Sequence, residues 1–135
     1  MDTLTPAARS RLMASIGPKD SQPERAVRRL LHAMGYRFRL HRRDLPGTPD
    51  IVLPGRGAVV EVRGCFWHQH RGCAAGRVPA SRLDYWGPKL AANVARDARN
   101  LRRLRRLGWR VAVVWECQVG RDAERVARRL RRFLG

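Results

Sequence analysis

The stretch PDIVLPGRGAVVEVR, residues 49–63, decides the fold. It contains two runs of mostly β-branched, apolar residues, 50–53 and 58–62, on either side of residues 54–57. β-Branched side chains favour strands, and the Pro and Gly residues between the two runs favour a turn. The sequence therefore predicts a hairpin of two short antiparallel strands.

A helix is expected before the hairpin, over residues 23–34. Pro23 suits the first turn of a helix, where its missing N–H is not needed, and Gly35 suits the end. Residues 36–40 alternate basic and apolar side chains, which predicts a half-buried strand. Residues 1–22 are polar, with a short helical patch. The apolar residues of the expected helix recur at helical spacing: Val27, Leu30, Leu31 and Met34.

A long helix, a strand and a last helix are expected after the hairpin. Residues 83–107 read as the long helix, in which Gly87 and Pro88 mark a point of kinking or breaking. Residues 111–115 are typical of a buried strand, which we expect to pair with residues 58–62. The order α-α-β-β-β-α-β-α predicts an α/β domain. Apolar stripes define the two helices: Leu83, Trp86, Leu90, Val94, Leu101 and Leu104; then Val126, Leu130 and Phe133.

The charge of the chain is strongly positive. Its 135 residues include 29 Lys or Arg and 11 Asp or Glu, for a formal net charge of +18. Such an excess favours a nucleic-acid partner, because cations that neutralise phosphates release condensed counterions. A codon bias toward Arg explains the scarcity of Lys but not the scarcity of acids. Two helical arginine runs are either solvated faces or phosphate contacts: Arg102, Arg103, Arg105 and Arg106; Arg128, Arg129, Arg131 and Arg132.

A membrane or secreted protein is not expected. No stretch reaches the roughly 20 apolar residues that span a bilayer. The N-terminal region lacks the apolar segment of a secretory signal. The chain has three cysteines, an odd number that argues against a disulfide framework and fits a cytoplasmic protein.

Two acidic residues fall at one end of the expected hairpin. Asp50 opens the first strand and Glu61 lies near the end of the second, so antiparallel pairing brings their carboxylates together. Carboxylate pairs bind Mg²⁺, which can polarise a phosphate and activate water. Arg63 is placed to stabilise charge on the transferring phosphorus. With Pro49, these residues resemble the PD-(D/E)xK signature, with Arg63 at the Lys position. The alternative is that these residues are an ordinary Pro-Asp turn and an exposed strand Glu that occur together by chance.

The next segment, GCFWHQHRGC at residues 64–73, concentrates metal ligands. Thiols and imidazoles are donors that Zn²⁺ prefers. Spacing alone leaves His68 open as a ligand in place of His70. The alternative is a set of free buried cysteines and surface histidines. Four residues can supply a tetrahedral site: Cys65, His70, Cys73 and Cys117.

The aromatic residues here are unusual for a loop. Phe66 and Trp67 are adjacent among polar residues, and Trp86 stands near the start of the following helix. In a basic protein, such rings suggest stacking on bases or insertion between them. The alternative is that they fill the core beneath the loop.

Several short motifs occur together over residues 9 to 118. They are Arg9-Ser10 with Met13 and Ile16; Leu45-Pro46-Gly47 with Pro49-Asp50; Gly64-Cys65-Phe66-Trp67-His68; Asn93-Val94 with Arg96-Asp97; and Gly108-Trp109-Arg110-Val111 followed by Val114-Trp115-Glu116-Cys117. In this combination the chain resembles the very-short-patch-repair (Vsr) DNA mismatch endonucleases of the PD-(D/E)xK superfamily. The resemblance implies a restriction-endonuclease-like mixed sheet flanked by helices, with a structural zinc site.

The resemblance also implies an activity. A Vsr-like enzyme makes a strand-specific nick 5′ of the mispaired thymine in a T:G mismatch, by Mg²⁺-dependent hydrolysis of a phosphodiester. Asp50 and the backbone carbonyl of Val62 match the positions that bind the catalytic metal. Glu24 matches a carboxylate that supports that site, and His68 matches the catalytic histidine.

Further roles follow from the same resemblance. The structural Zn²⁺ ligands are matched by Cys65, His70, Cys73 and Cys117. An aromatic wedge inserted beside the mismatch is matched by Phe66, Trp67 and Trp86. An N-terminal arm that reaches the opposite groove is matched by Met13 and Ile16. The partner is double-stranded DNA with a T:G mismatch, in the bacterial cytoplasm at the nucleoid.

The chain also departs from the family pattern. Val62 and Arg63 stand where well-known members have Thr-His, and Glu61 stands where they have an apolar residue. We hypothesise that Glu61 supplies metal-binding capacity and that Arg63 replaces the charge stabilisation of the lost histidine. The zinc loop has one more residue between His70 and Cys73 than the family pattern.

We expect a DNA-contacting arm at residues 1–22 and a single endonuclease domain at residues 23–135, acting as a monomer. His32 and His41 are expected to be surface histidines without a function. Two other functions stay open: a restriction-type or modification-dependent nuclease of the same fold, and a non-catalytic, zinc-stabilised DNA-binding module. Acidic residues beside a phosphate argue against the module, because like charges weaken binding.

Overall fold

The computed structural model describes residues 21–76 and 83–135, so Met13 and Ile16 of the expected arm lie outside the described residues. The elements in chain order are α2 (Gln22–Ala33), β1 (Arg39–Leu40), β2 (Ile51–Leu53), the 3₁₀ turn η1 (Pro54–Arg56), β3 (Ala58–Arg63), the 3₁₀ turn η2 (Ala74–Gly76), α3 (Leu83–Arg106), β4 (Arg110–Trp115), α4 (Glu116–Arg121) and α5 (Ala123–Leu134). They form a mixed α/β fold around a four-stranded sheet of order β1-β2-β3-β4.

The predicted hairpin is confirmed. β2 and β3 pair antiparallel, with Ile51 opposite Val60, so Asp50 and Glu61 meet at the same end. Gly57 ends the connecting turn at a φ of 60°, a left-handed conformation that glycine adopts without strain. β4 pairs parallel to β3, which confirms the predicted pairing of residues 111–115 with residues 58–62.

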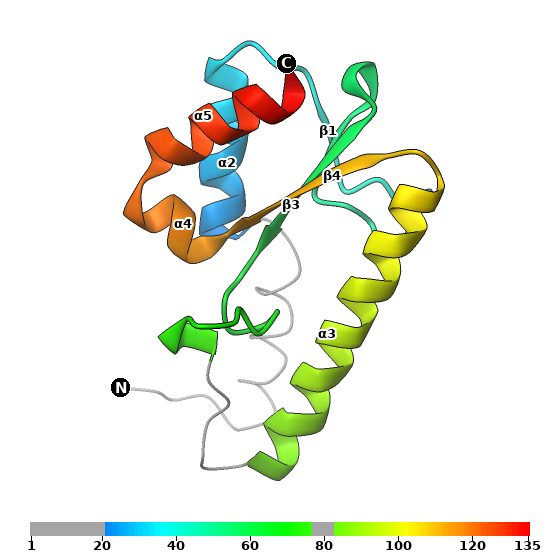
Figure 1. Cartoon of the computed structure of the whole chain (residues 1–135), viewed down its shortest axis with the longest axis vertical. Coiled ribbons are helices and arrows are strands. Elements are labelled where there is room, and N and C mark those ends of the chain that lie inside the picture. The colour runs from blue at the N-terminus through cyan, green and yellow to red at the C-terminus, as the bar shows by residue number, and fades with distance from the viewer. Residues whose placement is uncertain (1–20, 77–82) are drawn as a thin grey trace, which may run out of the picture.

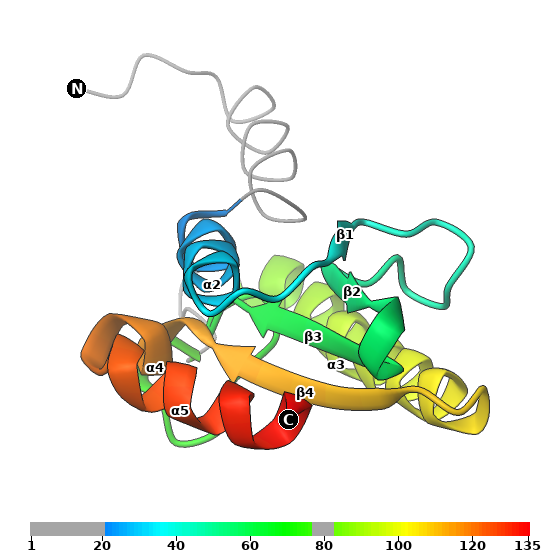
Figure 2. The same ribbon diagram turned by 90° about the horizontal axis from the view of Figure 1, so that it is seen from above.

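Helices cover both faces of the sheet, as Figures 1 and 2 show. Side chains alternate between the two faces of a strand, and β3 divides its residues accordingly. One core joins α2 and α5 to the sheet through residues that include Leu31, Val60 and Leu130. The other joins α3 to the opposite face through Val59 and Leu104. The result is a three-layer arrangement, with the sheet between α3 and the other helices.

Helix α2 begins and ends as the sequence predicts. The Ser21 side chain accepts a hydrogen bond from the Glu24 amide at 3.4 Å, which caps the first turn. Gly35 follows the helix at a φ of 87°. The cap fixes the position of Glu24 in the first turn of the helix.

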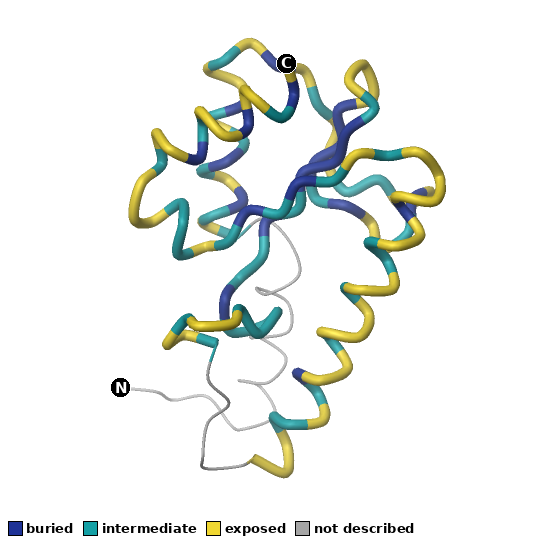
Figure 3. Tube along the Cα trace, viewed as in Figure 1, coloured by how far each residue is buried: buried dark blue, intermediate teal, exposed yellow. Residues whose placement is uncertain are grey.

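Helix α3 differs from the expectation in two ways. It continues as one helix from Leu83 through Pro88, so of the two expected outcomes, a kink or a break, the break does not occur. Its stripe is also only partly buried, because Leu90 and Leu104 are buried whereas Leu83 and Val94 are 57% and 43% exposed. Much of the helix projects beyond the sheet, and Figure 3 shows exposed segments along its length. A helix that covers a sheet only at one end buries only part of its apolar stripe.

Two further differences concern short elements. The strand expected at residues 36–40 pairs only at Arg39–Leu40. The C-terminal region contains two helices rather than one, because α4 forms directly after β4 and Asp122 then caps α5 by accepting from the Arg125 amide at 3.0 Å. No helix among residues 21–76 and 83–135 is both long and apolar enough to cross a membrane.

Candidate active site and metal sites

The hairpin places Asp50 beside the backbone of β3. The Val62 amide donates a hydrogen bond to Oδ2 of Asp50 at 3.0 Å. The N–H and C=O of one strand residue point to the same side, so the Val62 carbonyl is also directed toward the Asp50 side of β3. The Asp50 carboxylate and the Val62 carbonyl thus lie in one small region. Both supply oxygen ligands suited to a hard cation.

A second carboxylate comes from helix α2. The Glu24 residue is only 2% exposed, and it forms with His41 and Asp50 a group whose potential ligand atoms all lie within 4.8 Å of one another. Oε1 of Glu24 contacts Arg28 at 2.5 Å and Nε2 of His41 at 2.7 Å. Two buried carboxylates this close repel each other unless a cation or a proton lies between them. The donor set therefore fits a divalent cation.

The proton affinity of Asp50 reflects this crowding. Burial raises the pKa of Asp50 to about 8, and the nearby Glu24 carboxylate adds to the rise. The hydrogen bond from the Val62 amide lowers the pKa and offsets part of this effect. A carboxyl group with this pKa exchanges its proton for a cation near neutral pH.

Glu61 and Arg63 form an ion pair on the same strand. Their side chains are 2.8 Å apart and 14% and 13% exposed. The guanidinium of Arg63 also lies 5.8 Å from the centre of the Trp115 ring. Both side chains line the same cleft as Asp50, as predicted, but the closest charged partner of Arg63 is Glu61.

His68 is paired with an acidic residue of α3. Its Nδ1 lies 2.6 Å from Oδ2 of Asp97. A carboxylate only accepts, so the shared proton lies on Nδ1 and the lone pair of the neutral ring is on Nε2. The carboxylate fixes this tautomer and the direction of the ring, which is the arrangement of a general base or acid.

One cleft unites these groups. It has a volume of about 860 Å³ and extends from α2 across the ends of β2 and β3 to α3. The lining includes the candidate acids and histidine together with polar residues of α3: Glu24, Asp50, Glu61, Arg63, His68, Lys89, Asn93 and Asp97. Residues far apart in the chain therefore face one space large enough to receive a piece of a nucleic-acid backbone.

The cysteine cluster lies close to the cleft. The ligand atoms of Cys65, His70, Cys73 and Cys117 all lie within 4.8 Å of one another. Nδ1 of His70 is 3.6 Å from the Cys65 sulfur and 3.4 Å from the Cys117 sulfur. A tetrahedral zinc ion separates a sulfur and a nitrogen ligand by about 3.6 Å. The four residues therefore fit a metal ion, and His70 rather than His68 is the imidazole that joins them.

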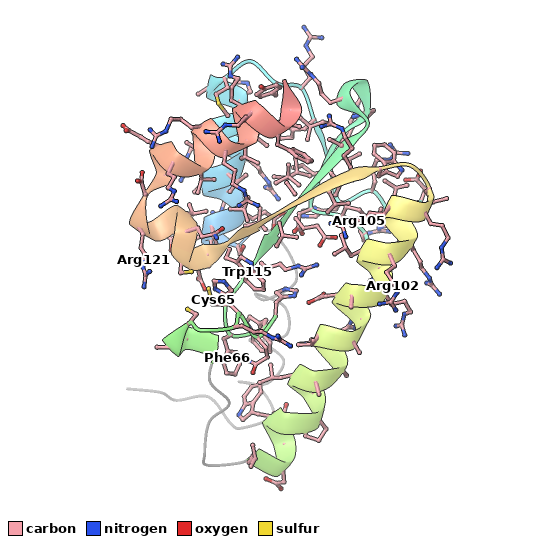
Figure 4. All side chains as sticks on the ribbon, viewed as in Figure 1. Cys65, Phe66, Arg102, Arg105, Trp115 and Arg121 are labelled. Atoms are coloured by element: carbon pink, nitrogen blue, oxygen red, sulfur yellow. The ribbon has the colours of Figure 1, made fainter. Side chains whose placement is uncertain are left out.

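Packing holds the cysteine cluster in place. The His70 ring stacks on Trp115 with centroids 4.1 Å apart, and Figure 4 shows Trp115 and Cys65 in the same region. Burial raises the pKa of the Cys65 thiol to about 12. A bound metal ion would replace that proton, because the thiolate is the form that coordinates.

The aromatic residues form a cluster of their own. Phe66, Trp67 and Trp86 contact one another edge to face, with centroids 5.2 to 5.8 Å apart. All three are half-buried, and none belongs to either hydrophobic core. Asn93 of α3 donates to the Trp67 carbonyl at 3.2 Å and holds the loop. This arrangement favours a surface cluster over core packing.

The structure adds two residues that sequence reasoning missed. His41, expected to be an uninvolved surface histidine, contacts Glu24 in the acidic group, so that expectation is wrong. Asp97 belonged to a recognised motif but had no predicted role, and it is the partner of His68. In the sequence, the only signal for this pair was that His68 and Asp97 both occur in the recognised motifs.

A cleft of this chemistry, in a chain with a net charge of +18, is that of a metal-dependent DNA endonuclease. Comparison with known proteins specifies the family. Residues 1–74 match the family model described as DNA mismatch endonuclease Vsr. The chain belongs to the Vsr family.

The relatives are named as nicking and mismatch enzymes. The chain is 56% identical over 133 residues to the type II nicking enzyme V.XorIIP of Xanthomonas oryzae pv. oryzae, covering 98% of this chain and 96% of the relative. It is 43% identical over 117 residues to the DNA mismatch endonuclease Vsr of Escherichia coli, covering 86% and 74%. It is 40% identical over 125 residues to the type II nicking enzyme V.NaeI of Lentzea aerocolonigenes, covering 87% and 72%.

Proposed function

We propose that this DNA endonuclease nicks one strand of a duplex 5′ of the mispaired thymine in a T:G mismatch, with Mg²⁺ as the catalytic cation. One observation carries the proposal: the acids, the paired histidine and two rings of the aromatic cluster, Phe66 and Trp67, border one cleft. The Escherichia coli relative is named a DNA mismatch endonuclease, which supports the mismatch as the trigger. We also propose that the mixed sheet and its flanking helices form a restriction-endonuclease-like fold.

The acids are proposed to hold the cation. Asp50, the Val62 carbonyl and Glu61 provide its oxygen ligands, and Glu24 supports them from α2. Bound Mg²⁺ supplies Lewis-acid polarisation of the scissile phosphate and lowers the pKa of a bound water. The Arg63 guanidinium donates to Oε2 of Glu61, so Oε1 is the oxygen proposed to bind the cation.

His68 and Arg63 are proposed to act on the phosphate. With Nδ1 held by Asp97, Nε2 of His68 can accept a proton from the attacking water or donate one to a phosphate oxygen. Arg63 lines the cleft, where its guanidinium can offset the charge that builds at phosphorus. The products are a 3′-hydroxyl and a 5′-phosphate.

Recognition is proposed to rest on stacking. Phe66, Trp67 and Trp86 form the wedge that enters beside the mismatch, where unstacking costs least. Residues 1–22, with Met13 and Ile16, are proposed as an arm to the opposite groove of the duplex, and residues 23–135 as the endonuclease domain. We propose a monomer.

The cysteine cluster is proposed as a structural Zn²⁺ site. It joins the loop at residues 64–73 to the start of α4 through Cys117. Four protein ligands leave no open position for chemistry, which is the pattern of a structural zinc ion. The loop that carries His68 and two of the wedge residues, Phe66 and Trp67, depends on this site for its shape.

The test is a nicking assay on a labelled duplex with a single T:G mismatch, with and without Mg²⁺. A matched duplex and the Asp50→Ala variant are the controls. A nick that needs the mismatch, Mg²⁺ and Asp50 supports the proposal. Cutting of both duplexes moves the function to a restriction-type nuclease. The Glu61→Gln variant tests the metal role of Glu61, since unimpaired nicking by this variant excludes it.

A further inference from the structure

His41 connects two parts of the acidic group. Its backbone amide donates to the Asp50 carbonyl at 3.1 Å, immediately beyond the pairing of β1 with β2. Its Nε2 lies 2.7 Å from Oε1 of Glu24, a residue of α2. The imidazole therefore bridges the hairpin and the helix at the point where their carboxylates meet.

The backbone of His41 adopts an unusual conformation. Its φ is 48°, in the left-handed region that non-glycine residues enter uncommonly. Such a conformation costs free energy and persists where surrounding contacts enforce it. At His41 the contacts on both sides, to Asp50 and to Glu24, do so.

Two side chains contact the same oxygen of Glu24. Arg28 and His41 both contact Oε1, at 2.5 and 2.7 Å. A carboxylate only accepts, and Nε2–H of a neutral imidazole donates to it. The Glu24 side chain is 3% exposed and thus has little water to orient it. The two donors fix the rotation of the carboxylate.

A direct metal bond to Nε2 of His41 is disfavoured by charge. The guanidinium nitrogen Nη2 of Arg28 lies 3.4 Å from this ring nitrogen. A divalent cation there would sit next to a permanent positive charge, and like charges at this distance repel strongly in a buried site. The imidazole is thus better suited to donate a hydrogen bond than to bind the metal ion.

We propose that His41 is a positioning residue of the catalytic cation site, acting through Glu24. By holding Oε1, it directs Oε2 toward the space shared with Asp50 and so raises the affinity for the divalent cation. This inference rests on the proposed function, because it concerns the same cation. Hydrogen-bond partners of groups at a metal site typically change metal affinity by about 10–100-fold.

The test compares two carboxamides at this position in the full, zinc-loaded chain. The amide nitrogen of Gln lies as many bonds from Cβ as Nε2 of His does, whereas that of Asn lies one bond closer. Asn also tolerates the left-handed conformation, so it removes the contact without adding backbone strain. Mn²⁺ is the probe, because free Mn²⁺ is counted directly by electron paramagnetic resonance. His32→Asn, at an exposed histidine of α2, is the matched control.

We expect His41→Asn to raise the Mn²⁺ dissociation constant about 10–100-fold, and His41→Gln to restore most of the affinity. At saturating Mn²⁺ the nicking rate of His41→Asn should return to near the wild-type value. An unchanged dissociation constant in His41→Asn, with or without a loss of stability, would overturn the proposal. So would a ¹⁴N coupling to bound Mn²⁺ that disappears in His41→Asn, because it would identify His41 as a ligand.

Asp50→Ala separates this inference from the proposed function. If Asp50→Ala abolishes Mn²⁺ binding and His41→Asn leaves it unchanged, the cation site stands and only the role of His41 fails. If Asp50→Ala also binds Mn²⁺ like the wild type, the proposed cation site itself is wrong.

Discussion

At the scale of single residues, the raised pKa of Asp50 predicts that binding of the proposed cation depends on pH. Burial and then Glu24 raise its pKa to about 8. The proton must leave before the carboxylate coordinates, so protons and Mg²⁺ compete. We expect the Mg²⁺ concentration for half-maximal nicking to rise as the pH falls below 8, by up to about tenfold per pH unit. Nicking rates measured against Mg²⁺ concentration at several pH values test this. A half-maximal concentration that is independent of pH would contradict it.

The raised pKa of Asp50 also determines how the folding stability changes with pH when no cation is bound. The folded pKa of Asp50 lies above its unfolded value of 3.8, so the folded chain binds the proton more tightly. Stability from this group is therefore present at low pH and is lost as the pH rises from about 4 to about 8. Asp50→Asn has no proton to lose, so its melting temperature should fall less over this window than that of the wild type.

Gly76 offers a steric test of the cysteine cluster. A Cβ at this position would lie 2.6 Å from the His70 carbonyl oxygen and 3.1 Å from the His70 amide nitrogen. Gly76→Ala should therefore displace His70, weaken zinc retention and lower the melting temperature by about 5 °C or more. Zinc release to a chromogenic chelator measures the first effect. Gly55→Ala, where a Cβ meets nothing within 4 Å, should match the wild type in both.

From the sequence, the clustering of candidate ligands could be predicted, but their hydrogen-bond partners could not. Two thiols within a short segment already indicate a metal site, and Asp50 and Glu61 follow from the hairpin. His41 reaches Glu24 across 17 positions, and His68 reaches Asp97 across 29. Such pairs depend on how helices dock on the sheet, which no local pattern specifies.

At the scale of elements, α3 acts as the support for His68. Asp97 fixes the ring from the helix, so Asp97→Asn should replace an acceptor-only carboxylate with an amide whose NH2 can donate to Nδ1 and permit the wrong tautomer. We expect kcat for nicking to fall by about 10²-fold or more, with little change in melting temperature. Asp84→Asn, at the exposed start of the same helix, should leave kcat unchanged. Equal rates for the two variants would show that His68 does not need its carboxylate.

The elements themselves were largely predictable where local and tertiary signals agree. The hairpin combines β-branched runs with a Pro-Gly turn, and β4 is a buried run beside it. The predictions of burial and of helix boundaries were wrong where tertiary contacts determine them. Leu83 and Val94 fit a helical stripe but lie on a part of α3 that the sheet does not cover. The separate helix α4 depends on the chain turning directly after β4, next to the cysteine cluster.

At the scale of the whole molecule, two helices on opposite sides of the sheet each carry a run of basic residues. The arginines of both α3 and α5 are exposed, and Figure 4 shows Arg102 and Arg105 projecting from α3. Of these two helices, only α3 contributes residues to the cleft, among them Lys89 and Arg96. A duplex engaged at the cleft should therefore pass α3, whereas no residue of α5 lines the cleft.

This difference predicts which arginines contact phosphates. Arg96 and Arg103 lie two helical turns apart on one side of α3, and Arg128 and Arg132 are exposed on α5. Removing a phosphate contact lowers the slope of log K against log salt by about 0.9. The pair Arg96→Ala and Arg103→Ala should therefore flatten the salt dependence of duplex binding, and Arg128→Ala with Arg132→Ala should not. Fluorescence anisotropy over a salt series measures both. Equal flattening would place DNA on both helices, and no flattening in either would make these arginines solvated faces.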